Sequence, residues 1–343
     1  MIALPASSSP CPPPPGPRAR AHRLLSTLVV ALAAAVLAAG CDFEEFTPAS
    51  RIDKPRIIAV SASPPVIGLD GESELTALVV DADGRDSTVA TEHAIDPADL
   101  DVRWRACNPW APVFEPDRDC PTQEALALVS NDGEAWQGQA RVRVSDVLAA
   151  FPPPDWVQDE IGQMDDGDGD GDGGEGCPHD YGFVELPIVV EVDIGDRRLV
   201  ALQRLRVTWD PVVRRGPAIA ALVLGDQVVD ATEAGSFVAG RQIRLGVSMD
   251  RDSLDPVCLD DDPDQVADEP VTYFAYVTAG ELLDEFEADV AYEVDGTESA
   301  RTLRWAAPTG GGAVVWLVAE DRDGGVGWAR FGLTAGAAAM AAP

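Results

Sequence analysis

The chain has 343 residues, a length that suits two domains after removal of a leader. Its hydrophobic content of 46% is enough for packed cores and excludes a globally disordered protein. The first 40 residues contain three arginines and no acid, so the remainder carries 22 bases against 59 acids, a formal net charge of −37. The electrostatic field of this charge excludes nucleic acid as a partner and favours cations or basic proteins.

The amino terminus has the pattern of a secretory signal peptide. Three arginines precede an apolar run over residues 24–39, which is shorter than the roughly 20 residues that a membrane-spanning helix needs. The run ends in Ala39-Gly40-Cys41, which resembles the lipobox of bacterial lipoproteins, although Ala38 stands near where that pattern often has leucine. The resemblance implies cleavage before Cys41, a diacylglyceryl group on its thiol and an acyl group on its new amine.

By this resemblance, residues 1–40 are a signal peptide and residues 41–53 a lipidated tether. The alternative is an ordinary signal peptide followed by an incidental cysteine. Since one acyl chain gives only marginal membrane binding, the two or three chains of a lipoprotein make the attachment stable. We therefore expect a cell-envelope protein, lipid-anchored to the inner or the outer membrane and facing the periplasm or the cell exterior.

A first β-rich module is predicted over residues 54–209, with a long acidic insertion at 108–182. Apolar and polar residues alternate with the period of two that is typical of strands, and turn residues separate the runs. The expected strands are Arg56–Ser61, Glu72–Asp83, Val102–Ala106, Trp136–Val144, Ile188–Ile194 and Leu199–Trp209. The turn Gly195-Asp196 joins the last two into a hairpin.

The insertion contains a run of alternating aspartate and glycine. Asp166, Asp168, Asp170 and Asp172 could supply oxygen ligands to a calcium ion. The EF-hand loop pattern fails at its last position, where Cys177 replaces the bidentate glutamate. Two interpretations stay open, a solvated low-complexity loop and a calcium-binding loop.

A second module is predicted over residues 210–335, followed by a flexible tail at 336–343. Its expected strands are Ile243–Met249, Thr272–Val277, Val290–Val294, Leu303–Ala306, Ala313–Glu320 and Gly327–Leu333. Asp210-Pro211 and Gly216-Pro217 suit a hinge between the modules. Helical character is sparse, with short turns expected at residues 145–151, capped by Ser145, and 281–287.

Both modules resemble the immunoglobulin-like domains of bacterial surface proteins. The resemblance rests on the stretches IIAVSASPP, ELTALVVDADG and VRWRAC in the first module and AVVWLVAEDRDGGVGWARF in the second. It implies an all-β chain with two immunoglobulin-like β-sandwich domains in tandem after the signal peptide and tether. In such a sandwich Trp104 would be a buried core tryptophan, and the family has no catalytic residues to transfer.

Four cysteines remain after cleavage if Cys41 carries lipid. An even number in an exported protein indicates disulfides, and their spacing fits no zinc ribbon. We expect a bond between Cys107 and Cys120 across a short proline-rich loop, and a second between Cys177 and Cys258. Other pairings of the four, and free buried thiols, stay open.

No serine-hydrolase, zinc-protease, nucleotide-binding or dinucleotide-binding motif occurs in the chain. The sequence therefore predicts a non-enzymatic, membrane-anchored envelope lipoprotein that acts as an interaction or spacer module, without a cofactor unless calcium binds. Two alternatives remain, a calcium-dependent adhesive or ligand-binding surface protein and a hydrolase with an unrecognised site.

Overall fold

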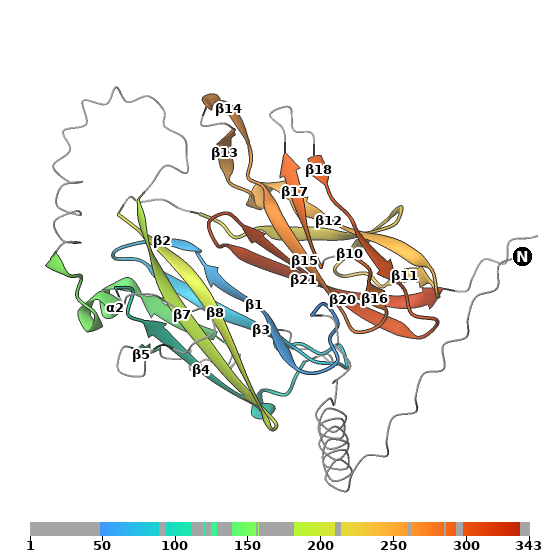
Figure 1. Ribbon diagram of the computed structural model, residues 1–343, viewed down its shortest axis with the longest axis horizontal. Helices are drawn as coiled ribbons and strands as arrows, with labels where there is room; N and C mark the ends of the chain where they lie inside the picture. The colour runs from blue at the N-terminus through green and yellow to red at the C-terminus, as the bar shows by residue number, and fades with distance from the viewer. Residues whose placement is uncertain are drawn as a thin grey trace, which may run out of the picture. The chain divides into compact units, whose positions relative to one another are not determined.

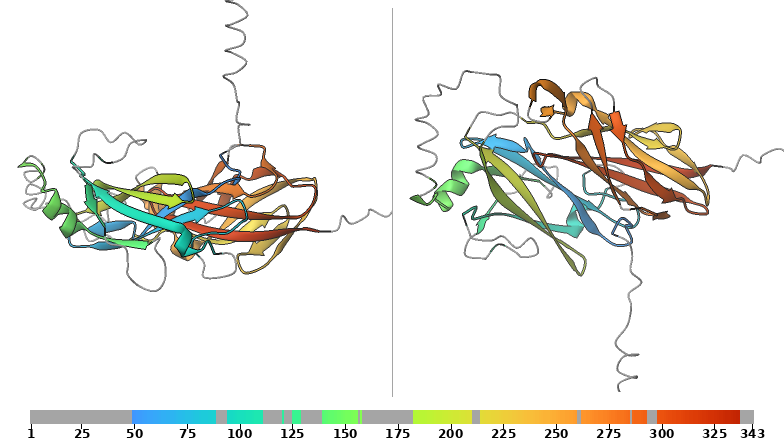
Figure 2. Two further views of the ribbon diagram at one scale, coloured as in Figure 1. Left: turned by 90° about the horizontal axis from the view of Figure 1, so that it is seen from below. Right: turned by 45° about the horizontal axis from the view of Figure 1, so that its top comes forward.

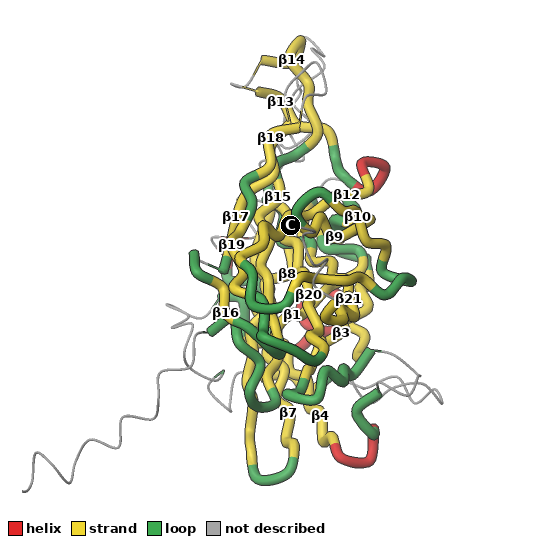
Figure 3. Tube along the Cα trace, turned by 90° about the vertical axis from the view of Figure 1, so that its right-hand side faces the viewer, coloured by secondary structure: helices red, strands yellow, loops and turns green. Residues whose placement is uncertain are grey.

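The computed structural model describes residues 49–88, 94–110, 120, 125–128, 139–155, 157, 182–209, 214–259, 262–284, 286–292 and 298–336 (Figure 1). All of them belong to one compact unit, Pro48–Pro343. Their regular secondary structure is almost entirely β-strand, which confirms the all-β prediction (Figure 3).

The amino-terminal strands form a β-sandwich, here called the first sandwich. One sheet has the order β1 (Arg56–Ser63), β3 (Glu72–Val80) and β6 (Gln139–Arg143). The other has the order β2 (Val66–Gly68), β8 (Arg197–Thr208), β7 (Phe183–Ile194), β4 (Leu100–Cys107) and β5 (Ala125–Ala127). The 3-10 turn η1 (Pro97–Asp99) precedes β4, and helix α2 (Val144–Ala150) follows β6.

The remaining strands form the second sandwich. One sheet has the order β10 (Gln227–Asp230), β9 (Ala218–Leu224), β12 (Gln242–Asp250), β19 (Leu303–Ala306) and β16 (Glu281–Leu282). The other has the order β11 (Gly235–Val238), β21 (Val326–Gly336), β20 (Gly312–Asp321), β15 (Val271–Val277), β17 (Glu287–Tyr292) and β18 (Glu298–Ala300). The 3-10 turn η2 (Arg251–Ser253) leads to a separate ribbon of β13 (Pro256–Leu259) and β14 (Asp262–Asp268).

The strand order of both sandwiches is that of an immunoglobulin-like domain. The neighbours β4-β7-β8 and β15-β20-β21 correspond to the C-F-G sheet of that fold, and β1-β3-β6 and β9-β12-β19 to its A-B-E sheet. In each C-F-G sheet a short early strand pairs in parallel with the last strand, β2 with β8 and β11 with β21. The second sandwich adds β17 and β18 beside strand C, as variable-type domains do.

Alternation of apolar residues explains which face of each strand is buried. On β4, Trp104 is 3% exposed and Ala106 is fully buried, whereas Arg103 and Arg105 point to the opposite face. Residues of each sandwich gather in their own core, one drawn from residues 57–207 and the other from residues 219–335. The predicted domain boundaries stay predictions.

Most predicted strands are confirmed, and so is the 195–196 hairpin turn, where Gly195 has φ +60°. The helical turn predicted at residues 281–287 is wrong, because Glu281 and Leu282 pair with β19 instead, a long-range contact that overrides local preference. Helix α2 exists near the predicted position, but its N-cap is Arg143 without a side-chain cap, so the role given to Ser145 is wrong. Within the span 108–182, the structure has β5, β6 and α2, of which β6 and α2 lie near the strand predicted at 136–144 and the turn predicted at 145–151.

Candidate functional site

Several residues singled out by the sequence lie outside the described residues. These are Cys41, Cys177, Asp166, Asp168, Asp170 and Asp172. Within the ranges that the structure describes, no group of three or more metal-ligating side chains is placed to hold a metal ion. No helix in those ranges is long and apolar enough to cross a bilayer.

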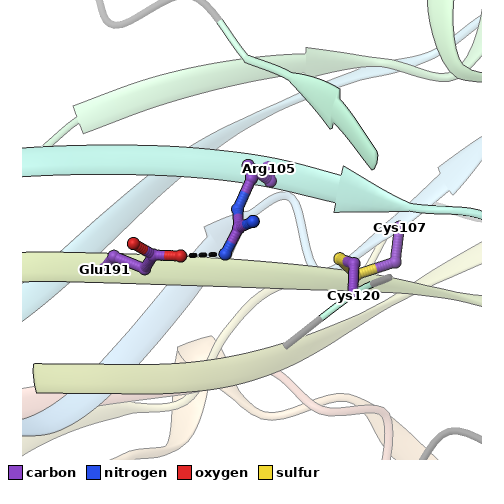
Figure 4. Close-up of a disulfide and its surroundings, with 4 residues drawn as sticks. All are labelled: Arg105, Cys107, Cys120 and Glu191. Atoms are coloured by element: carbon purple, nitrogen blue, oxygen red, sulfur yellow. Dashed lines mark hydrogen bonds and ion pairs between the residues drawn. A yellow bond between two sulfur atoms is a disulfide. The ribbon is translucent and has the colours of Figure 1, made fainter. Parts of the chain in front are cut away.

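The Cys107–Cys120 disulfide predicted from the sequence is present (Figure 4). Cys107 ends β4, and both cysteines are buried against Val189 of β7. Cys258 also takes part in a disulfide, and its partner lies outside the described residues, so the predicted pairing with Cys177 stays a prediction. The buried bond therefore ties Cys120 to the end of β4.

Next to this disulfide, the outer face of the first sandwich carries a compact ion-pair network. Glu191 of β7 is only 4% exposed and pairs with Arg105 (Figure 4). Arg198 and Arg103 also contact Glu191, at 2.6 and 3.8 Å. Arg103 also pairs with Asp193. The pairs join arginines of β4 and β8 to acids of β7, so the network links three neighbouring strands.

The two sandwiches meet at a contact region that we call the junction, where β1 runs beside β21 (Figures 1 and 2). Its apolar centre combines side chains of both sandwiches in one cluster. The buried members are Ile52, Ala59, Leu78, Val80, Trp316 and Val318. The outward face of β20 is therefore covered by the first sandwich rather than exposed, and burial of this apolar area stabilises the contact.

Each sandwich contributes one turn of sequence Asp-x-Asp-Gly to the junction. In the first, residues 81–85, one carboxylate oxygen of Asp81 accepts hydrogen bonds from the amides of Asp83 (3.0 Å) and Arg85 (2.9 Å). The fifth residue, Arg85, returns its guanidinium to the other oxygen of Asp81 at 2.7 Å. Gly84 has φ +79°, a left-handed conformation that glycine adopts at little cost.

The second turn, residues 321–325, repeats these backbone contacts with a different fifth residue. Asp321 Oδ1 accepts from the amides of Asp323 (2.8 Å) and Gly325 (2.7 Å), and Gly324 has φ +80°. A β-carbon at Gly325 would overlap Asp321 Oδ2 and would come within 3.0 Å of the Cα of Gly216. A side chain at this fifth position would therefore require the Asp321 carboxylate or the backbone at Gly216 to shift.

An arginine on the last strand of each sandwich reaches the Asp-x-Asp-Gly turn of the other. Arg330 of β21 donates to the carbonyl of Gly84 at 3.1 and 3.2 Å. Arg206 of β8 donates to the carbonyl of Arg322 at 2.8 Å and pairs with Asp323. The junction is thus reciprocal, with one guanidinium crossing in each direction.

Carboxylates gather on the second-sandwich side of the junction. Asp321 and Asp323 are 7% and 3% exposed, and Glu269 is 1% exposed. Burial, followed by the charge of Glu269, raises the pKa of Asp321 to about 8. Arg214 lies within 3.3 Å of Asp323, so this carboxylate is held between Arg214 and Arg206.

The segment that precedes β1 is also attached at the junction. Ile52 is buried and its amide donates to the carbonyl of Val277 at 2.8 Å, while the amide of Val277 donates to the carbonyl of Ser50 at 2.9 Å. Val277 belongs to β15 of the second sandwich. The segment that leads into the first sandwich is therefore hydrogen-bonded to the second sandwich.

Beside the apolar cluster, the junction contains a hollow of about 260 Å³. Strands of both sandwiches line it with mostly apolar side chains, and its polar members are Gln203, Tyr276 and Glu320. Two further hollows, of about 370 and 460 Å³, are also lined in part by Glu320. Glu320 therefore stands where the three hollows meet.

No family model matches the chain, and no curated protein matches it. Among solved structures it is similar to the fibronectin(III)-like modules of Clostridium thermocellum CbhA, with 11% identity over 83% of this chain and 98% of that one and a TM-score of 0.20. It is also similar to the Ig1-2 module of the Drosophila receptor protein tyrosine phosphatase DLAR, with 9% identity over 83% and 100% and a TM-score of 0.21. At these TM-scores the likeness carries no argument, and the immunoglobulin-like assignment rests on the strand order.

Sequence reasoning missed the junction. The repeated Asp-x-Asp-Gly at 81–84 and 321–324 is a visible signal, but the sequence does not indicate that the two copies lie at one contact region. The arginines that bind these turns, Arg330 and Arg206, lie 246 and 117 residues from their partners. Local pattern carries no information about contacts at such separations.

Proposed function

We propose that this chain is a cell-envelope lipoprotein, anchored through Cys41, whose paired immunoglobulin-like sandwiches act as a non-enzymatic interaction or spacer module. The reciprocal junction is the observation that carries the module part of the proposal. An apolar cluster, two crossing arginines and the segment before β1 join the two sandwiches. These contacts favour one fixed orientation of the sandwiches over free rotation of one relative to the other. The anchor part rests on the apolar run that ends at Cys41.

The anchor is tested in the native host by feeding an alkyne-tagged fatty acid and comparing the wild type with Cys41→Ser. The wild type should incorporate the tag and sediment with membranes, and the variant should do neither. Mass spectrometry of the native amino terminus should give an acylated Cys41 as the first residue. A wild-type protein with an unmodified cysteine, recovered with soluble proteins, would remove the anchor.

The spacer role is tested by small-angle X-ray scattering of the exported Cys41→Ser protein. We expect one orientation of the sandwiches to fit its scattering curve at both low and high salt. Replacing both crossing arginines, Arg206→Ala and Arg330→Ala, should increase the radius of gyration. The proposal is contradicted if the scattering curve of the protein with both arginines intact can be fitted only by a mixture of several sandwich orientations.

A second candidate is calcium-dependent adhesion, favoured by the alternating aspartates at 166–172. Calcium bound there would raise the melting temperature, because a ligand that binds only the folded state stabilises it. The comparison is a thermal melt with calcium and with a chelator, in the wild type and in a protein with Asp166, Asp168, Asp170 and Asp172 changed to Asn. An identical melting temperature under all four conditions removes this candidate.

A further inference from the structure

The hollow at the junction has the character of a small ligand site. Its wall combines β1 and β8 of the first sandwich with β15, β20 and β21 of the second. Apolar side chains dominate this wall: Ile57, Ala59, Val60, Leu202, Val318 and Val326. Clefts between domains that are apolar and hold a few polar groups are common ligand sites, and about 260 Å³ lies just below the usual range of about 300–1,000 Å³.

Glu320 supplies the charge at the rim of this hollow. It is the only ionised side chain among the lining residues, and no arginine or lysine lines the hollow. Glu320 is exposed to solvent at this rim, yet partial desolvation by its neighbours still raises the pKa of its carboxyl. A carboxylate in such surroundings gains more from an opposite charge than one in bulk water does.

Aromatic side chains flank the same rim. Phe274 and Tyr276 line the hollow, and the ring of Phe286 lies 5.8 Å from that of Phe274 and 6.0 Å from that of Tyr276. Aromatic faces attract alkylated cations as well as hydrocarbon. The rim therefore offers both a negative charge and π-surface.

Arginines near the hollow are engaged elsewhere. Burial raises the pKa of the Tyr276 hydroxyl to about 12, and the charge of Arg56 offsets only part of this rise. The Arg56 guanidinium binds Asp53 and the carbonyl of Ala49. Arg204 pairs with Glu185. Arg322 borders the two outer hollows but not this one.

The charge of the whole chain acts in the same direction. A formal net charge of −34 raises the local concentration of cations at the surface and repels anions. Both this net charge and the Glu320 carboxylate would repel an anionic amphiphile, whereas both would attract a cationic one.

From this geometry we propose that the junction hollow binds a small cationic amphiphile, with its hydrocarbon part among the apolar residues and its ammonium group on the Glu320 carboxylate. The ligand class is an alkylammonium compound, such as an amine with a chain of a few carbons. This site does not depend on the membrane anchor, and its failure would leave the proposed function intact.

The probe is n-hexylammonium, titrated by isothermal calorimetry at pH 7.5 into the exported Cys41→Ser protein. We expect saturable binding to one site, with 1-hexanol and hexanoate at least about tenfold weaker, because one well-placed charge contact is worth a factor of that order. Equal affinity for the ammonium, the alcohol and the carboxylate overturns the charge assignment. The absence of saturable binding overturns the site.

Glu320→Gln keeps the size of the side chain and removes its charge, so hexylammonium should bind about tenfold more weakly while hexanol binding is unchanged. Glu298→Gln is the matched control, because Glu298 is an exposed acid on β18 that does not line the hollow. A loss of affinity of the same size in both variants would mean that only net charge matters and would contradict the proposal. Ala59→Leu, which narrows the hollow, should weaken the ammonium and the alcohol together; if it fails to fold, the comparison of the two glutamine variants decides.

Discussion

The turns at residues 81–85 and 321–325 share a sequence pattern and a set of hydrogen bonds, yet they differ in how their first aspartate is neutralised. In the first turn Arg85 pairs with Asp81 within the same five residues. In the second turn Gly325 takes that position, and Asp321 is left near Glu269 with a raised pKa. The comparison teaches that an identical backbone turn can carry a self-contained charge pair or a buried acid, depending on its fifth residue.

The second turn also depends on cations supplied from elsewhere. Arg206 comes from the first sandwich and Arg214 from the segment before β9, and both contact Asp323. Its stability is thus tied to tertiary structure, whereas the 81–85 turn holds much of its stability locally. Five substitutions test this difference.

The largest effect is expected from Gly325→Ala. The new methyl group would overlap Asp321 Oδ2 and crowd the Cα of Gly216, so the free energy of unfolding should fall by about 3 kcal/mol, as for other overpacked sites. Urea denaturation measures this loss. A variant as stable as the wild type would mean that the turn can open without cost.

Removal of the crossing arginine on the first sandwich comes next. Arg206→Ala leaves the buried Asp323 with Arg214 alone, so we expect a loss of about 2 kcal/mol. Arg330→Ala is the reciprocal change, and it should cost about 1 kcal/mol because Arg330 donates mainly to a neutral carbonyl. Equal losses in the two variants would contradict the proposed asymmetry between the turns.

The pH dependence of stability is expected to reflect Asp321. Its pKa is about 8 in the folded protein against about 4 in the unfolded chain, so between these values the folded state binds the extra proton. This contribution to stability is therefore full at low pH and is lost as pH rises from 4 to 8, by at most roughly 1.4 kcal/mol per pH unit.

Asp321→Asn removes that proton while keeping an oxygen for the two turn amides. Urea midpoints at pH 5, 6.5 and 8 should decline less steeply in this variant than in the wild type. Parallel declines in the two proteins would assign the slope to other groups.

The smallest effect is expected from Arg85→Ala. The Arg85 side chain is half exposed, and Asp81 keeps its two amide hydrogen bonds without it, so the loss should stay below about 1 kcal/mol. The variant is also the matched control for Gly325→Ala, because both change the fifth residue of the same turn pattern. A loss larger than that of Gly325→Ala would reverse the comparison.

Much of the fold follows from the sequence, because alternation of apolar residues decides which strands can bury one face. Val102, Trp104 and Ala106 predict β4 and its inward face correctly, and the Gly195 turn predicts the β7–β8 hairpin. Residues 218–224 were not predicted, since a continuous apolar run gives no alternation. Two-residue strands such as β16 exist only because a neighbouring strand pairs with them.

The junction and its hollow could not be predicted in the same way. Their residues come from strands far apart in the chain, and their polar members have no distinctive spacing. Glu320 is one of 59 acids in the sequence, and only the fold sets it apart by placing it beside Tyr276 and Gln203. The predicted lipobox, by contrast, is a local sequence pattern, and its recognition needs no tertiary structure.

The attachment of Ser50 and Ile52 to Val277 bears on how the molecule would carry mechanical load. A pulling force applied to the chain before Ser50 would act on the hydrogen bonds to β15 before it acts on β1. Strand β15 lies inside its sheet, between β20 and β17. Force is therefore shared with the carboxy-terminal half from the outset, and β1 is shielded from being peeled off the edge of its own sheet.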